Sequence, residues 1–169
     1  MHRYSKVKTD LGVFRVVCSP KGITSIHPAS QRASAFEKVY KKRFGEYPLN
    51  RDIPDTYKKA LRAAIKGHPA PSVAVDWTCF TAFQRKVLKR LQKVPAGKVQ
   101  TYAWLARQVG NPKAARAVGN VMAQNPIPFL IPCHRIVPSS GGIGNYGLGK
   151  DLKRELLMRE GAKSLKFEV

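Results

Sequence analysis

The pattern of apolar and polar positions near the N-terminus predicts a small sheet. Three short runs rich in β-branched and aromatic residues span residues 3–9, 13–18 and 23–27. The turn-forming sequences Asp10-Leu11-Gly12 and Ser19-Pro20-Lys21-Gly22 separate them. We interpret the three runs as a small antiparallel meander.

Two amphipathic segments follow these strands. Residues 34–44 carry apolar side chains at helical spacing, and residues 54–66 do the same with a proline near the first turn. Gly67 is expected to stop the second helix. The side chains expected to face inward are Phe36, Val39 and Tyr40 in the first helix and Tyr57, Leu61, Ala64 and Ile65 in the second. The sequence 68–71, His-Pro-Ala-Pro, is the best linker candidate, and residues 73–75 form a candidate short strand.

The sequence pattern of the second half predicts mostly helices. Thr81 and Gln84 have the spacing of a capping box and open a helix. Helices are then expected over residues 101–109 and 113–123, joined by Gly110-Asn111-Pro112, with Pro112 opening the second of them. Such a pair is compatible with a helix-turn-helix and equally with an ordinary helical hairpin. A last helix is expected over residues 150–159, ended by Glu160-Gly161, with a short strand within 164–169.

These elements predict an α/β (α+β) protein in two parts. A small N-terminal domain, residues 1–75, combines an antiparallel sheet with helices and has no assignable chemistry. Residues 76–169 form a mostly helical second domain that holds the helix-turn-helix candidate, at about 101–123, and the reactive segment described below.

Composition narrows the partners and the compartment. The 169 residues are 43% hydrophobic, which is enough for a packed core, and their net charge is +21. Because the charge is spread over both halves, it favours a polyanion partner, nucleic acid first, although a basic solvated surface is the simpler alternative. We see neither an apolar run of membrane-spanning length nor a signal-peptide core, so we expect a cytoplasmic protein, or a nuclear one in a eukaryote.

Cysteine and histidine spacing argues against a metal or disulfide framework. The three cysteines are Cys18, Cys79 and Cys133, and no Cys-x-x-Cys sequence occurs. We therefore expect no metal site and no cofactor.

The proline-rich stretch 125–138 contains the candidate chemistry. Its four prolines disfavour a helix and interrupt a central strand, while its apolar side chains indicate burial. Cys133 and His134 lie in the middle of this stiff segment. The pair suits an activated thiol nucleophile, although a lone cysteine is often only a small core residue.

Several motifs of this half together resemble the O6-alkylguanine-DNA alkyltransferases. They are Arg116-Ala117-Val118-Gly119, Asn125-Pro126, Pro132-Cys133-His134-Arg135, Gly144-Asn145-Tyr146 and Leu156-Leu157-Met158-Arg159-Glu160-Gly161. The resemblance covers residues 80–161, and the region before Asp76 matches only loosely.

The resemblance implies a direct transfer of the alkyl group from O6 of guanine to Cys133, once per molecule. His134 would take the thiol proton through a water, and Glu160 would bind the other ring nitrogen, which follows the logic of a catalytic triad. Asn125 would connect the helix-turn-helix to the cysteine segment. The implied partner is double-stranded DNA carrying O6-alkylguanine, bound by a monomer.

The same resemblance implies roles in DNA and base binding. Arg116 would fill the gap left by a flipped nucleotide, and Tyr102 would contact the rotated phosphate. The small side chains of Ala115, Ala117 and Gly119 suit a helix that enters the minor groove, although small residues also simply allow tight helix packing. The implied pocket consists of the carbonyls of Cys133 and Ile136, the side chain of Tyr146, the amide of Gly147 (often serine in the family), and walls from Met122 and Pro128.

Two other functions stay open at this point. A helix-turn-helix protein without chemistry, such as a regulator or lesion sensor, would bind DNA and leave the alkyl group in place. A Cys-His hydrolase would turn over repeatedly on a small acyl substrate, but the sequence lacks the usual hydrolase motifs.

Overall fold

A four-stranded sheet organises the N-terminal half of the computed structural model, which describes residues 1–163. Strands β1 (Arg3–Thr9), β2 (Gly12–Ser19) and β3 (Gly22–Pro28) form the predicted antiparallel meander. The sheet order is β3-β2-β1-β4, and the two-residue strand β4 (Leu49–Asn50), which the pattern did not predict, pairs parallel to β1.

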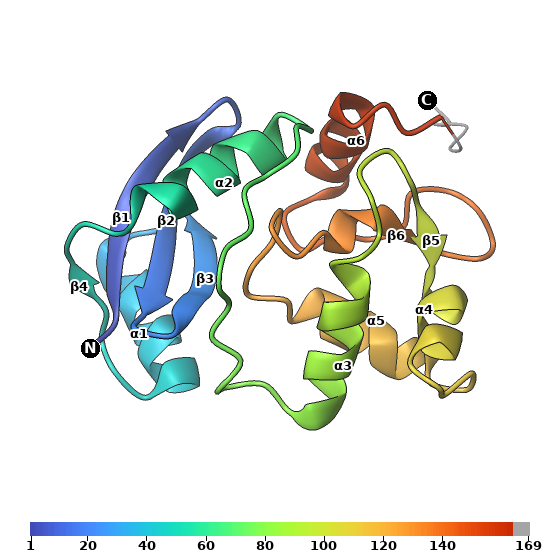
Figure 1. Ribbon diagram of the computed structural model, residues 1–169, viewed down its shortest axis with the longest axis horizontal. Coiled ribbons are helices and arrows are strands. Elements are labelled where there is room, and N and C mark those ends of the chain that lie inside the picture. The colour runs from blue at the N-terminus through green and yellow to red at the C-terminus, as the bar shows by residue number, and fades with distance from the viewer. Residues whose placement is uncertain (164–169) are drawn as a thin grey trace.

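Helices cover both faces of this sheet (Figure 1). Helix α1 (Ala33–Phe44) packs Phe36 and Tyr40 against Tyr4 and Val17 on one face. Helix α2 (Asp55–Ile65) adds Leu61 and Ile65 to the core on the other face. The burial of both faces explains why β2 reads as a nearly continuous apolar run.

The inward position predicted for Val39 is wrong. Its side chain is 54% exposed, because only Phe36 and Tyr40, one turn apart, project from α1 onto the sheet. The predicted strand at residues 73–75 is reduced to one isolated bridge between Ile23 and Val75, beside β3.

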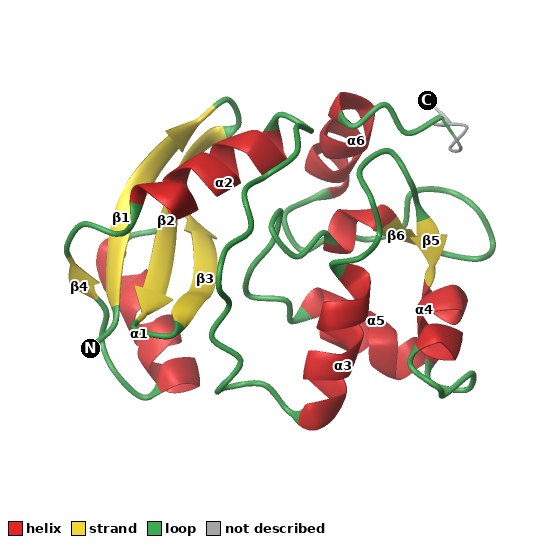
Figure 2. Ribbon diagram, in the orientation of Figure 1, coloured by secondary structure: helices red, strands yellow, loops and turns green. Residues whose placement is uncertain are grey.

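Helices make up most of the regular structure of the C-terminal half, and long loops connect them (Figure 2). Helix α3 (Ala82–Leu91) begins with the predicted capping box of Thr81 and Gln84. Helix α4 (Tyr102–Gln108) and helix α5 (Ala115–Ala123) confirm the predicted helical pair. Helix α6 (Lys150–Arg159) has the predicted bounds.

The turn between α4 and α5 is longer than predicted. Residues 111–114 form a separate turn in which the Ala114 amide donates to the Asn111 carbonyl at 3.0 Å, so α5 begins at Ala115 and not at Pro112. The two helices lie against each other across this turn, in the arrangement of a helix-turn-helix (Figure 1).

The proline-rich stretch contains short regular structure that was not predicted. Residues Cys133–Arg135 form a 3₁₀ turn, η1, which needs only bonds between residues three apart and therefore tolerates the proline before it. Strand β6 (Ile136–Val137) follows and pairs parallel with β5 (Gln100–Thr101), which was also missed. The short strand suggested within 164–169 lies outside the described residues.

One core connects the two halves. It runs from the sheet through α3 to α5 and the proline-rich stretch, and Phe14 of β2 meets Phe129 edge to face at 5.1 Å. Phe129 has φ of 71°, a strained value for a bulky residue, and its buried ring (2% exposed) holds it there. None of the helices in the described part of the chain has the length and apolar character needed to cross a membrane.

Candidate active site

The Cys133 thiol lies where the proline-rich stretch meets helix α5. Its residue is 7% exposed and begins η1. The Cys133 amide donates to the Ile131 carbonyl at 2.8 Å, and its own carbonyl accepts the Ile136 amide. With both backbone groups bonded in a proline-stiffened segment, the sulfur is held in one place.

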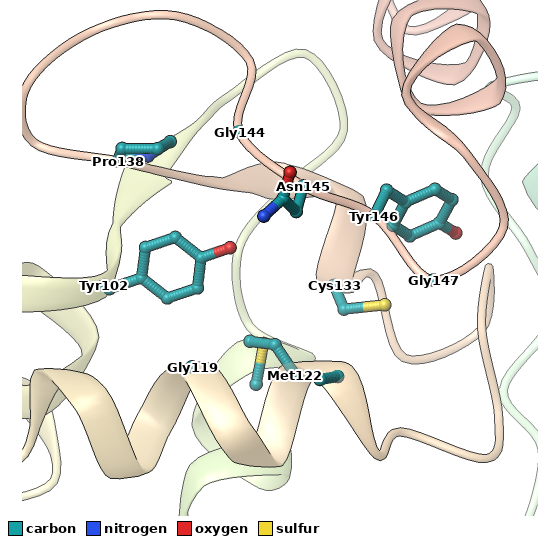
Figure 3. A pocket seen from close by; sticks show the side chains of 10 residues that line it. Tyr102, Gly119, Met122, Cys133, Pro138, Gly144, Asn145, Tyr146 and Gly147 are labelled. Atoms are coloured by element: carbon teal, nitrogen blue, oxygen red, sulfur yellow. The ribbon is translucent and has the colours of Figure 1, made fainter.

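A cavity of about 520 Å³ opens on one side of Cys133. This volume is within the usual range for small-molecule sites. The Tyr102 ring from α4, Met122 from α5 and Asn145 from the loop before α6 project around it (Figure 3). The remaining lining residues are Gly119, Ala123, Pro138, Gly144, Tyr146 and Gly147.

His134, the residue after Cys133, forms a buried pair with Glu160. Nε2 of His134 and Oε1 of Glu160 are 2.8 Å apart, and each side chain is 1% exposed. Arg135 also donates to the Glu160 carboxylate, from Nη2 at 2.8 Å and Nε at 3.0 Å. Since an ionised carboxylate only accepts, Nε2 of His134 carries the proton and Nδ1 is left as an acceptor. Nδ1 is buried and has no hydrogen-bond partner within residues 1–163.

The pKa shifts define the resting protonation states. Burial alone would raise the pKa of Glu160, but hydrogen bonds from His134 and Arg135 lower it to about 2. Burial lowers the pKa of His134, and the bond with Glu160 offsets this only in part. Burial raises the pKa of Cys133, against the opposing influence of Asn125 and Lys153. The resting site therefore contains a protonated thiol, a neutral imidazole able to accept a proton, and an ionised carboxylate.

Lys153 is a part of the site that the sequence reading missed. Its ammonium is fully buried and donates to the Ile136 carbonyl at 2.7 Å and the Asn145 carbonyl at 3.3 Å. Burial lowers the pKa of Lys153 to about 8. A signal was present, because Lys153 precedes Leu156 by three residues and so lies on the same inward face of α6.

Asn125 connects the end of α5 to the cysteine segment. Its Nδ2 donates to the Ile131 carbonyl at 2.9 Å, and its Oδ1 accepts the Ile127 amide at 3.0 Å. Both polar atoms are therefore used to position the backbone that leads to Cys133.

The other predicted site residues fall into three places. Arg116 and Ala117 are exposed on α5, beside the half-buried Ala115. Gly119 lies next to Tyr102 at the cavity wall, where a Cβ at position 119 would be 3.9 Å from the tyrosine ring. A second cavity, of about 300 Å³, also borders Cys133. Both cavities are lined by Met122, Tyr146 and Gly147, whereas Pro128 lines only the second one.

Ile136 is predicted to contribute its backbone carbonyl to the pocket, and its side chain lies elsewhere. That side chain is completely buried and borders neither cavity, because β6 turns it into the core. Its carbonyl is already engaged by Lys153.

Further residues of the site were not predicted. Arg135 binds Glu160 and also donates to the Val94 carbonyl at 2.6 Å. Pro138, Gly144 and Asn145 line the cavity. A Cβ at Gly144 would be only 2.7 Å from Pro138, and the φ of 73° there also requires glycine. No group of three or more His, Cys, Asp or Glu within the described range could hold a metal ion.

Fold and site together define a class: α/β proteins in which a helix-turn-helix and a buried cysteine border the same cavity, and the histidine after that cysteine is paired with a buried glutamate. The family model described as "6-O-methylguanine DNA methyltransferase, DNA binding domain" matches residues 82–162. A methylated-DNA–protein-cysteine methyltransferase of Shigella flexneri is 32% identical over 160 residues, covering 92% of this chain and 94% of that protein. The chain belongs to the 6-O-methylguanine-DNA methyltransferase family.

Other relatives extend this comparison. The human methylated-DNA–protein-cysteine methyltransferase is 50% identical over 99 residues, which are 58% of this chain and 48% of the human protein. The chain thus spans about half the length of that relative and of several others. The Mycobacterium tuberculosis OGT in complex with DNA has a TM-score of 0.77 and 28% identity, covering 97% of this chain and 96% of that one.

Proposed function

We propose that this chain repairs DNA by moving an alkyl group from O6 of guanine to its own Cys133, once per molecule. The observation that carries the proposal is that the buried Cys133 borders the cavity beside helix α5, while the next residue, His134, is paired with the buried Glu160. Family membership and the name of the Shigella relative support it.

The transfer is a displacement at the alkyl carbon. The thiol proton passes to Nδ1 of His134, through the bridging water that the family resemblance implies, and Glu160 stabilises the resulting imidazolium. A carbon–sulfur bond forms as the bond from that carbon to O6 breaks. The electron pair goes to the guanine, which takes a proton and leaves as the normal base. The thioether product has no group in the proposal to cleave it, so the protein acts once.

The raised pKa of Cys133 keeps the thiol protonated until the substrate binds. A buried resting thiol is protonated and protected from other electrophiles. Deprotonation is then coupled to binding, when the neutral His134 accepts the proton.

DNA binding would use the exposed side of α5. The small Ala117 beside Arg116 suits close approach to the minor groove, and Arg116 would occupy the space of a flipped nucleotide. Tyr102 would meet the rotated phosphate, and Tyr146 with the amide of Gly147 would lie at the O6 side. The cost of unstacking is a few kcal/mol, which phosphate attraction to a chain of net charge +21 helps to offset.

The remaining assignments are also part of the proposal. We assign residues 76–169 as the DNA-binding and active-site domain, and residues 1–75 as a domain that braces it and adds phosphate attraction. The protein is proposed to act as a monomer in the cytoplasm, or in the nucleus of a eukaryote, without a cofactor.

Intact mass after incubation with duplex DNA carrying O6-methylguanine tests the proposal. We expect one methyl group per protein, located on Cys133, with Cys133→Ala inactive and Cys79→Ala fully active. The exposed Cys79 is the matched control, because it is a free thiol outside the site. Tight binding of lesion DNA with no mass change would instead support a sensor, and multiple turnovers on an ester would support a hydrolase.

A further inference from the structure

Helix α3 carries a row of cations on its exposed side. They are Arg85, Lys86, Lys89 and Lys93, here called the α3 stripe, and all four are exposed. Positions 86, 89 and 93 are three and four residues apart, so these side chains share one face of the helix. Because a helix rises about 1.5 Å per residue, the stripe extends about 10 Å along the axis from Lys86 to Lys93.

No carboxylate balances the charge of this stripe. The sequence contains no aspartate or glutamate between Asp76 and Asp151. None of the four cations forms an ion pair with a residue in the described range 1–163. Arg85 lies near the N-terminus of α3, where the helix dipole disfavours positive charge, and it has a like charge four residues away at Lys89. The free protein therefore carries the stripe at a cost in stability, which an anionic partner would offset.

The stripe adjoins the helix-turn-helix. Helix α3 lies against α4 and α5 (Figure 1). A Cβ at Gly110, in the turn after α4, would be 3.9 Å from Nζ of Lys86, so this ammonium lies beside that turn. Arg90 of α3 donates to Oε1 of Gln108 from Nη2 at 2.7 Å and from Nε at 3.1 Å, and its guanidinium lies 4.9 Å from the centre of the Trp104 ring. These contacts hold α3 against α4, so the stripe and the α4–α5 turn belong to one surface.

This surface leads to the helix that is proposed to enter the minor groove. Lys113 is exposed in the α4–α5 turn, and Arg116 is exposed on α5. Each strand of a DNA duplex carries one phosphate per about 3.4 Å of helix axis, so a stripe of about 10 Å has the length of about three successive phosphates. Charge sign, length and position all suit a DNA backbone.

We propose that the α3 stripe binds backbone phosphates of the same duplex, on one side of the lesion. The inference rests on the proposed function and deepens it, because it extends the bound DNA beyond the helix-turn-helix. The contact is one-sided, since the stripe lies beside the α4–α5 turn and therefore at the N-terminal end of α5.

The test variant is the triple substitution Lys86→Gln, Lys89→Gln and Lys93→Gln. It removes three charges from the stripe, and glutamine has nearly the same helix propensity as lysine. The pair Lys86→Gln and Lys93→Gln repeats the test if the triple variant does not fold.

The matched control removes three charges from the N-terminal half. It combines Lys38→Gln, Lys42→Gln and Lys59→Gln, which are exposed positions on α1 and α2. Both triple variants are compared with their parent in a Cys133→Ala chain, so that the lesion stays in the DNA while binding is measured.

The measurement is the dissociation constant of trace labelled protein for O6-methylguanine duplexes over a series of salt concentrations. One duplex spans about one helical turn, or about 10 base pairs, around the lesion, and two others add about one turn on one side or on the other. Excess DNA keeps one protein on each duplex. We expect tighter binding when the duplex is extended on one side only. The slope of log affinity against log salt should be steeper there by about 2–3, since each phosphate contact contributes about 0.9. The stripe variant should lose this one-sided gain, and the control variant should keep it.

Three outcomes would overturn the inference: a gain that is equal on both sides, no gain on either side, or a stripe variant that keeps the one-sided gain. Binding of two short duplexes per protein, reduced to one in the stripe variant, would place a second duplex on the stripe and also overturn it. Failure of the wild type to transfer methyl from any of these duplexes would be a different result, because it would overturn the proposed function itself.

Discussion

Replacing Glu160 by glutamine should separate the electrostatics of the site from its shape. A glutamine side chain has nearly the volume of a glutamate but carries one acceptor oxygen and an NH₂ donor. The carboxylate now accepts from His134 Nε2 and from two nitrogens of Arg135. A single amide oxygen cannot accept from all of these donors. The NH₂ group of the glutamine would therefore lie against the N–H of His134 or Arg135, which leaves a buried donor without an acceptor.

The expected loss of stability follows from the pKa of Glu160. Its fall from an ordinary 4.5 to about 2 corresponds to about 3 kcal/mol, at about 1.4 kcal/mol per pH unit. Because the folded pKa is depressed, this contribution is fully present above about pH 4.5 and is lost as the pH falls through about 2. The difference in unfolding free energy between wild type and Glu160→Gln should therefore be level near neutral pH and shrink in acid.

The expected loss of activity is larger. Without the carboxylate, an imidazolium at His134 has no negative partner, while the positive charge of Arg135 still disfavours it. General-base assistance contributes on the order of 10²–10⁴-fold, so the single-turnover transfer of methyl should slow by about that factor.

Rapid-quench kinetics with O6-methylguanine duplex and urea unfolding between pH 2 and 7 check the two effects. Glu155→Gln is the control, because Glu155 forms only a partly exposed ion pair with Arg159 on the same helix. A Glu160→Gln protein that transfers methyl at the wild-type rate would refute the role given to the carboxylate. An unchanged stability at pH 7 would refute the assignment of the low pKa.

Two further predictions concern residues outside this pair. Lys153→Met removes the donor shared by the Ile136 and Asn145 carbonyls and should slow alkyl transfer, with partial rescue in Lys153→Arg. Single-turnover kinetics measures the three rates, and equal rates in wild type and both variants would contradict the prediction. Arg116→Ala should slow transfer from duplex DNA by roughly tenfold or more, as an unstacking cost of a few kcal/mol implies, but leave the rate on a single-stranded lesion nearly unchanged. An equal loss on both substrates would point to general phosphate binding.

Much of the secondary structure was predictable, because its signals are local. The meander follows from short apolar runs and turn residues, and α3 follows from a capping box whose two residues are three positions apart. The errors in these elements have tertiary causes. Val39 has helical spacing but lies beside a cavity, and the single bridge at Val75 depends on where the chain passes β3.

The site, too, depends partly on local sequence and partly on tertiary contacts. Sequence alone determined the residue types available for chemistry, with a cysteine and a histidine adjacent in a stretch stiffened by proline and a carboxylate after the last helix. Only the tertiary structure decided that Glu160 is buried against Arg135, that Lys153 points inward, and that α1 walls a second cavity. The reason is physical: whether a charged group is buried and paired depends on segments distant in the chain. Arg135, for example, donates to the Val94 carbonyl 41 residues away, and no local pattern encodes that contact.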